Sequence, residues 1–193
     1  PFHPGPHAPL HRFICSAAPP DLQGVPRVSR RRFPSNDPER RQWQDPETIL
    51  SSIGLLEGMI FVDVGCGEGF FALPAARRVG PEGKVYAVDI NPDAVARLSE
   101  QAASEGLVPL YAACREAEAT VVCEGCADIV FFGNDLHDFA DPEQAIRNAG
   151  AMLKPSGLLV DLDWKPGQMA FGPPAGKRFS VEKDLGRTNR REY

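Results

Sequence analysis

A run of closely spaced glycines after a short apolar segment constrains the fold of this chain most. Residues 59–64 are apolar except for Asp63 and indicate a buried strand, while the apolar, Ala-rich segment 70–79 indicates a helix. Between them lie three glycines two residues apart: Gly65, Gly67 and Gly69. Glycine accepts positive φ and lets a ligand approach the backbone. The stretch therefore predicts a strand, a glycine turn and a helix beside a ligand.

The spacing of these glycines argues against a dinucleotide site. The dinucleotide fingerprint is G-x-G-x-x-G, whose last glycine packs the helix on the strand beneath a pyrophosphate. Here Phe70 takes that position, and Asp63 and Glu68 lie before and within the turn. Two carboxylates would repel a pyrophosphate and attract a cationic, amino-bearing ligand. A nicotinamide-dependent oxidoreductase is therefore the disfavoured alternative.

Strand-like and helix-like segments alternate along the rest of the chain. Two short helices are expected first, one capped by Asn36 or Asp37 and one opened by Asp45, and later helices follow Asn91 and Asp141. The further strands are expected at 84–90, 107–113, 127–132 and 158–164. This order predicts an α/β fold, a doubly wound, mostly parallel sheet with helices on both faces, as in Rossmann-like proteins.

The second strand ends in a carboxylate suited to a ribose. Asp89 lies about 20 residues past the glycine turn, the distance at which a βαβ unit presents an acidic residue beside the ligand. A carboxylate can accept hydrogen bonds from both ribose hydroxyls.

The sequence Asp63-x-Gly65-x-Gly67-x-Gly69 resembles the first motif of the class I S-adenosylmethionine-dependent methyltransferases. With the ordered elements after it, the resemblance covers about residues 37–178. It implies S-adenosyl-L-methionine as cofactor and a small-molecule methyl acceptor, with Glu116 receiving the adenine amino group and Glu118 as the alternative. The cofactor-binding residues that it implies are Asp63, Gly65, Cys66, Gly67, Gly69, Asp89, Ile90, Glu116, Ala117 and Asn134.

In the resembling fold, the loop after the fourth strand faces the transferred methyl group. Methyl transfer is a displacement at carbon, so a base is needed only if the acceptor must lose a proton. The catalytic candidates are therefore His137, Asn134 and Asp135, and His137 alone titrates near neutral pH without a large pKa shift. In the alternative interpretation His137 only fixes the loop, while Asp138 and Asp141 cap the next helix.

Farther along, Asp161 and Asp163 end the fifth strand, where they can hold a cationic acceptor or bind Arg-rich segments.

Length and charge set the broad class. The 193 residues and the net charge of −5 fit one domain and argue against a nucleic-acid substrate, although arginines cluster at 27–41 in what we interpret as a solvated basic arm. No apolar run is long enough for a bilayer and no secretory signal pattern is present, so we expect a cytoplasmic protein without membrane association.

The five cysteines give no metal site by spacing. In a chain without an export signal we expect them to be reduced, and Cys123 and Cys126 could supply only half of a zinc site. This pair precedes the fourth strand, which places it away from the ligand edge.

The domain boundaries follow from composition. Residues 1–34 are Pro-rich and are expected to be irregular or disordered, residues 35–178 form the cofactor-binding domain, and residues 179–193 form a polar tail. The resembling family adds a helix and two strands where only about thirty residues without strand-like runs follow Trp164. Two alternatives follow: either the chain is truncated, or its C-terminal strands are missing and another element or subunit, such as a second copy in a homo-oligomer, covers the sheet edge. A non-catalytic cofactor-binding sensor or interaction module is the second functional alternative.

Overall fold

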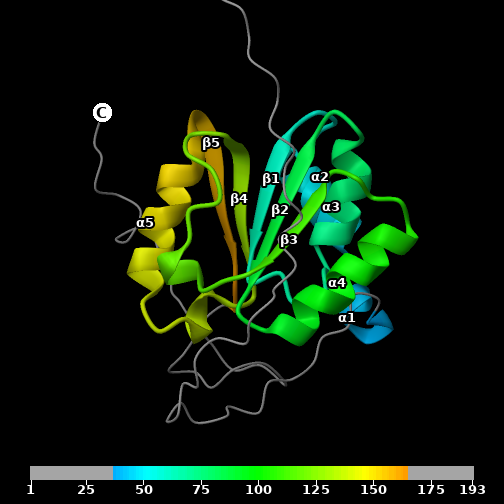
Figure 1. Cartoon of the computed structure of the whole chain (residues 1–193), viewed down its shortest axis with the longest axis horizontal. Helices are drawn as coiled ribbons and strands as arrows, with labels where there is room; N and C mark the ends of the chain where they lie inside the picture. The colour runs from blue at the N-terminus through cyan, green and yellow to red at the C-terminus, as the bar shows by residue number, and fades with distance from the viewer. Residues whose placement is uncertain (1–36, 165–193) are drawn as a thin grey trace, which may run out of the picture. The chain divides into compact units, whose positions relative to one another are not determined.

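The computed structural model describes residues 37–164 (Figure 1), so the expected segments 1–34 and 179–193 lie outside the described residues. The helices are α1 (Pro38–Trp43), α2 (Pro46–Ser52), α3 (Ala72–Val79), α4 (Pro92–Ser104) and α5 (Pro142–Met152), with single 3-10 turns η1 (Ala117–Ala119) and η2 (Leu136–Asp138). The strands are β1 (Ile60–Val64), β2 (Lys84–Asp89), β3 (Leu110–Cys114), β4 (Ala127–Gly133) and β5 (Leu153–Leu162). Within this range, no helix has the length and apolarity that crossing a membrane requires.

The five strands form one parallel sheet in the order β3-β2-β1-β4-β5. This confirms the predicted α/β fold. The chain leaves β1 on one side toward β2 and later returns on the other side through β4, so the strand order reverses next to β1. In open α/β sheets, ligands bind at the carboxyl ends of the strands at such a reversal. The glycine turn begins there.

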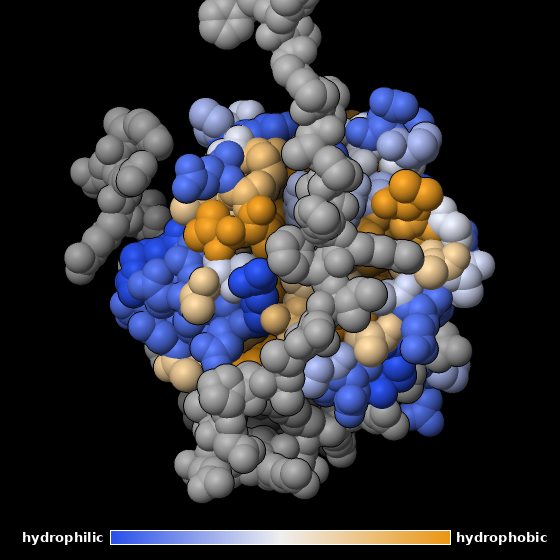
Figure 2. Space-filling view, in the orientation of Figure 1, coloured by the Kyte–Doolittle hydropathy of each residue, from blue (hydrophilic) through white to orange (hydrophobic). Residues whose placement is uncertain are grey.

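Helices cover both faces of the sheet, with α5 on one side and α2, α3 and α4 on the other (Figure 1). Alternate residues of β1 point to opposite faces: Phe61 packs with α3 and α4, whereas Val62 packs with α5. Helix α5 buries Ala145, Ala149 and Met152, and its outer surface is hydrophilic (Figure 2). The two cores fix the direction of every side chain at the carboxyl edge.

Four helices begin as the sequence predicts, with a capping side chain followed by proline at the first helical position. Asp37, rather than Asn36, caps α1, and Asp45, Asn91 and Asp141 cap α2, α4 and α5. Each cap accepts backbone N–H groups that the first helical turn leaves unbonded.

The start of the fifth strand differs from the prediction. The strand was expected at 158–164, after a turn-forming Lys-Pro-Ser-Gly sequence at 154–157, but β5 already begins at Leu153, where it pairs with Ala127. Leu158 then pairs with Ile129, so the four intervening residues form an irregularity within the strand. A Pro-Ser-Gly sequence that predicts a turn is thus accommodated as a bulge.

A second difference concerns the cysteines. Cys123 and Cys126 form a disulfide, with 5.9 Å between their Cα atoms, whereas reduced thiols were expected. The expectation rested on the redox conditions of an assumed compartment, which do not report whether two thiols three residues apart can meet. Cys66 is a free, buried thiol.

We expect Gly69→Ala to lower the free energy of unfolding by about 2–3 kcal/mol. Gly69 has a φ of +91°, and an added Cβ would lie 2.4 Å from Cδ1 of the buried Leu98 and 3.1 Å from Cγ of Leu73. Denaturant unfolding measures the loss. Gly67→Ala is the control: its φ is +54°, and no atom lies within 4 Å of the new Cβ. It should cost only about 1 kcal/mol, and equal losses at both positions would contradict the packing argument.

Candidate active site

The glycine turn is held against β2 by its own backbone. The N–H groups of Gly65 and Cys66 both donate to the Val88 carbonyl, at 2.7 and 3.0 Å. All three glycines have positive φ, which a side chain would strain. Cys66 is buried, and burial raises the pKa of its thiol well above the usual value. The thiol is therefore neutral and packs in the core beside α3.

Asp89 ties the glycine turn to the end of β2. Its Oδ2 accepts a hydrogen bond from the Gly67 N–H at 2.8 Å, and its Oδ1 accepts one from Asn91 at 2.8 Å. Ile90 follows with 46% of its surface exposed, a large share for an apolar side chain. The structure thus brings an oriented carboxylate and an exposed apolar side chain to the same strand end.

Asp63 is a buried carboxylate beneath the turn. It is 2% exposed, it accepts a hydrogen bond from the Ala72 N–H, and its Oδ2 has no hydrogen-bond partner among the described residues. Burial raises the pKa of this carboxyl to about 7, while the nearby Arg40 guanidinium opposes the rise. The side chain therefore titrates close to neutral pH.

The loop after β4 packs directly on the glycine turn. Asn134 has a φ of +68°, and its N–H donates to the Leu162 carbonyl at 2.8 Å. The next side chain, Asp135, lies so close to Gly65 that a Cβ there would be 1.4 Å from its Oδ2. Neither oxygen of Asp135 has a hydrogen-bond partner within residues 37–164. Burial, followed by repulsion from Asp63, raises the pKa of Asp135 well above its usual value.

Arg40 of α1 is buried at the same edge. It was expected in a solvated basic arm, but it is only 7% exposed. The interpretation is therefore wrong for Arg40; Arg27, Arg30, Arg31 and Arg32 lie outside the described residues. Its Nε donates to Oε1 of Gln44 at 2.7 Å, and its Cζ lies 3.9 Å from the centre of the Phe70 ring. Arg40 of the short helix α1 and its C-cap residue Gln44, four residues apart, thus lie beside the glycine turn.

Helix α1 also reaches the loop after β4 and the end of β5. Gln44 Oε1 accepts a second hydrogen bond, from Nδ2 of Asn134 at 2.8 Å. Trp43, which the sequence favours as a packing residue, lies 5.5 Å from Trp164 between ring centres. Sequence reasoning did not identify Arg40 or Gln44 as site residues, although their spacing of four residues was available as a signal.

His137 and Asp163 form a buried pair. The imidazole Nδ1 lies 2.8 and 2.9 Å from the two carboxylate oxygens of Asp163, and the side chains are 5% and 4% exposed. The Trp164 N–H donates to the same carboxylate at 2.7 Å. Within the described residues Asp163 thus contacts His137, while its expected roles as a holder of a cationic acceptor or of Arg-rich segments stay predictions. A carboxylate on Nδ1 favours the tautomer that carries its proton there and leaves Nε2 as the acceptor.

The two glutamates near η1 differ in whether their carboxylates already hold part of the protein. Glu118 Oε1 accepts from the Ala140 and Asp141 N–H groups, whereas Glu116 is exposed at the start of η1. Asp141 caps α5 as expected, but Asp138 does not cap it. Of the two candidates for the adenine amino group, only Glu118 binds the backbone of residues 140 and 141, and Glu116 does not.

Glu68 does not act as the sequence argument assumed. Its Oε1 pairs with Nε of Arg97 at 2.8 Å, which neutralises much of its charge. The acceptor oxygens that face the turn without an ion-pair partner in the described range therefore belong to Asp63, Asp89 and Asp135.

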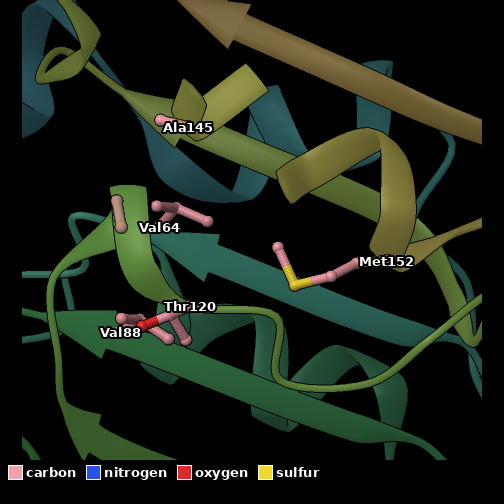
Figure 3. A pocket seen from close by; sticks show the side chains of 6 residues that line it. Val64, Val88, Thr120, Ala145 and Met152 are labelled. Atoms are coloured by element: carbon pink, nitrogen blue, oxygen red, sulfur yellow. The ribbon is translucent and has the colours of Figure 1, made fainter. Parts of the chain in front are cut away.

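A small pocket lies between α5 and the sheet, beneath η1 (Figure 3). Val64, Val88, Ala145 and Met152 make its wall apolar, and the Thr120 hydroxyl donates to the Glu116 carbonyl. Among the described residues that line the pocket, Thr120 thus has the only polar side chain, and its hydroxyl donates to the backbone rather than into the pocket. The carboxyl edge, with its unsatisfied carboxylates, is the better candidate site.

The residues at the carboxyl edge fit S-adenosylmethionine. Three buried carboxylate oxygens without partners suit a ligand that carries positive charge and N–H donors, and the glycine turn provides close backbone approach. Within residues 37–164, no group of three or more His, Cys, Asp or Glu side chains is arranged to hold a metal ion.

Comparison with known proteins identifies the family. A family model described as a methyltransferase domain matches residues 55–172, more than half of the chain. The chain is also similar to a SAM dependent methyltransferase from Aquifex aeolicus of known crystal structure, with a TM-score of 0.72, 30% identity, and coverage of 78% of this chain and 80% of that one.

Two curated relatives have different acceptors by name. The ubiquinone/menaquinone biosynthesis C-methyltransferase UbiE of Laribacter hongkongensis is 30% identical over 121 residues, 61% of this chain and 49% of the relative. The Nocamycin O-methyltransferase of Saccharothrix syringae is 31% identical over 111 residues, 58% of this chain and 40% of the relative. The chain spans about half the length of these relatives or less.

Proposed function

This chain belongs to the family of S-adenosylmethionine-dependent methyltransferase domains, and on that premise we propose that it transfers a methyl group to a small-molecule acceptor at the loop after β4. The observation that carries the proposal is the hydrogen bond from the Gly67 N–H to Asp89, which holds the glycine turn and an acidic strand end together at the sheet reversal. The family match favours methyl transfer over the nicotinamide-dependent alternative.

In this proposal the nucleoside lies along the ends of β1, β2 and β3. Asp89 accepts the ribose hydroxyls and Glu116 receives the adenine amino group, with Ile90 and Ala117 as apolar contacts. The amino-acid end lies over the turn, beside the remaining proposed cofactor-binding residues: Asp63, Gly65, Cys66, Gly67, Gly69 and Asn134. The support is the exposure of Ile90 and Glu116 at the strand ends, next to the oriented carboxylate of Asp89.

His137 is proposed as the base for an acceptor that must lose a proton. When bound, the cofactor supplies an electrophilic methyl group on a sulfonium. Asp163 holds the imidazole in the tautomer that accepts at Nε2, and the low exposure of both side chains excludes water. Asn134 and Asp135 complete the loop beside the turn. Since one curated relative is named a C-methyltransferase and another an O-methyltransferase, the acceptor class proposed here is a small molecule with an ionisable carbon or hydroxyl group.

Titration calorimetry with S-adenosylmethionine and S-adenosylhomocysteine tests the cofactor. We expect both to bind, while NAD at the same concentrations should not. Absence of binding at millimolar S-adenosylmethionine would overturn the proposal. Turnover of a panel of small carbon and hydroxyl acceptors then separates an enzyme from a cofactor-binding module without catalysis.

Asp89→Asn should weaken S-adenosylhomocysteine binding by about 1–3 kcal/mol, because the neutral amide cannot accept both charge-assisted ribose hydrogen bonds. Asparagine keeps the size of the side chain and one acceptor for the backbone N–H groups. Asp93→Asn, at an exposed position in the first turn of α4, is the control and should leave the affinity unchanged. An unaltered affinity in Asp89→Asn would mean that the ribose lies elsewhere.

A further inference from the structure

Arg40 is held between the two loops that border the proposed cofactor site. Its guanidinium lies over Phe70, which directly follows the glycine turn, and it shares Gln44 with Asn134 of the loop after β4. Burying an arginine side chain costs free energy unless the charge is compensated. Burial lowers the pKa of Arg40 to about 10, and the attraction of Asp63 and Asp135 keeps it from falling further. The guanidinium is therefore charged at neutral pH and faces both carboxylates.

The carboxylates around Arg40 are not fully compensated by it. Oδ2 of Asp63 and both oxygens of Asp135 are buried without hydrogen-bond partners in the described part of the chain. These are three acceptor oxygens near a single guanidinium, and Asp89 adds a further acidic group nearby. The carboxyl edge of the sheet thus presents two features to a ligand: buried carboxyl oxygens that need N–H donors, and the positively charged guanidinium of Arg40.

This pattern is complementary to the charged groups of an α-amino acid. An ammonium group would give N–H donors and positive charge to the carboxylates, and a carboxylate would match the guanidinium, which binds such groups through two hydrogen bonds. The apolar wall of Phe70 strengthens both interactions because it excludes water.

We propose that Arg40 binds the carboxylate of the cofactor's amino-acid end and that Asp135, with Asp63, binds its ammonium group. The inference rests on the proposed function and adds two residues to the cofactor site. It gives Asp135 a binding role, whereas the sequence placed it among the catalytic candidates.

Three nucleosides that differ only at the amino-acid end test the proposal by calorimetry. S-adenosylhomocysteine has both charged groups, S-adenosyl-3-thiopropylamine keeps the amine and lacks the carboxylate, and 5′-deoxy-5′-methylthioadenosine lacks both. Arg40→Met, which keeps the packing on Phe70, should weaken S-adenosylhomocysteine about 10- to 100-fold and the other two less than about 3-fold. Asp135→Asn should weaken both amine-bearing ligands and leave methylthioadenosine unchanged.

Two further variants keep the test decisive. Arg40→Lys retains the charge but loses the paired donors, so it should weaken S-adenosylhomocysteine less than Arg40→Met does. Arg77→Met, which removes an exposed pair with Glu105, should alter no ligand. Equal weakening of all three nucleosides by Arg40→Met, with native circular dichroism, would overturn the proposal, as would unchanged S-adenosylhomocysteine affinity. Failure of the wild-type protein to bind any of the three would instead overturn the proposed function itself.

Discussion

His137→Gln is expected to lower kcat by about 10²- to 10⁴-fold on an acceptor that loses a proton, the usual contribution of a positioned general base. Glutamine can keep a hydrogen bond to Asp163 but cannot take up a proton. Cofactor affinity should change less than about 2-fold, because the imidazole contacts Asp163 rather than the glycine turn. Steady-state rates and cofactor titration on the same samples measure the two effects.

Asp163→Asn separates a base from a residue that merely fixes the loop. The amide can stabilise the wrong tautomer of His137, so the rate should fall strongly and its pH profile should shift. Asp138→Asn is the matched control, because Asp138 lies 3.6 Å from Nε2 but is 56% exposed; its rate should fall less than about 3-fold. A full rate in His137→Gln would leave His137 with a structural role only.

Asp63→Asn is expected to remove a pH dependence of stability worth up to about 4 kcal/mol. The pKa of Asp63 is about 7 in the folded protein because of burial and near 4 when unfolded, so at intermediate pH the folded state binds more protons than the unfolded state. Stability from this group is therefore complete below about pH 4 and is lost as pH rises to about 7. One pKa unit corresponds to about 1.4 kcal/mol.

Urea unfolding at pH 4, 6 and 8 measures this dependence. The difference in unfolding free energy between Asp63→Asn and the wild type should rise in favour of the variant as the pH increases. Asp135 contributes in the same direction, since its pKa is also raised by burial, and Arg40 stays charged throughout this range. Glu100→Gln, on the exposed face of α4, should give a curve parallel to the wild type. A parallel curve for Asp63→Asn would show that Asp63 is ionised in the folded protein.

The sequence predicted the fold because its local signals agree with one another. Apolar runs, cap-and-proline pairs and the glycine turn each specify an element within a few residues, and the alternating order leaves few topologies. The disagreement at residues 154–157 arose because a turn-forming sequence can also be absorbed as an irregularity in a strand. Pairing with β4 decides between these outcomes, and local sequence does not report pairing.

The sequence predicted contacts within the site only where the residues belong to a recognisable motif. Asp89 and Gly67 occur at motif spacing, and the structure joins them by a hydrogen bond. The burial of Arg40 and the contact between His137 and Asp163 depend on elements that are distant in sequence. Local composition therefore suggested that Arg40 is solvated, and it suggested a cationic partner for Asp163. Charge counting likewise misjudged Glu68, because the compensating Arg97 comes from α4.

The packing of Trp43 against Trp164 has a practical consequence. These are the two tryptophans of the chain, and their ring centres lie 5.5 Å apart where α1 meets the end of β5. Intrinsic fluorescence excited at the indole band therefore originates from one spot, next to the helix that carries Arg40. The protein contains its own optical reporter of events at that spot, and no dye needs to be attached to observe them.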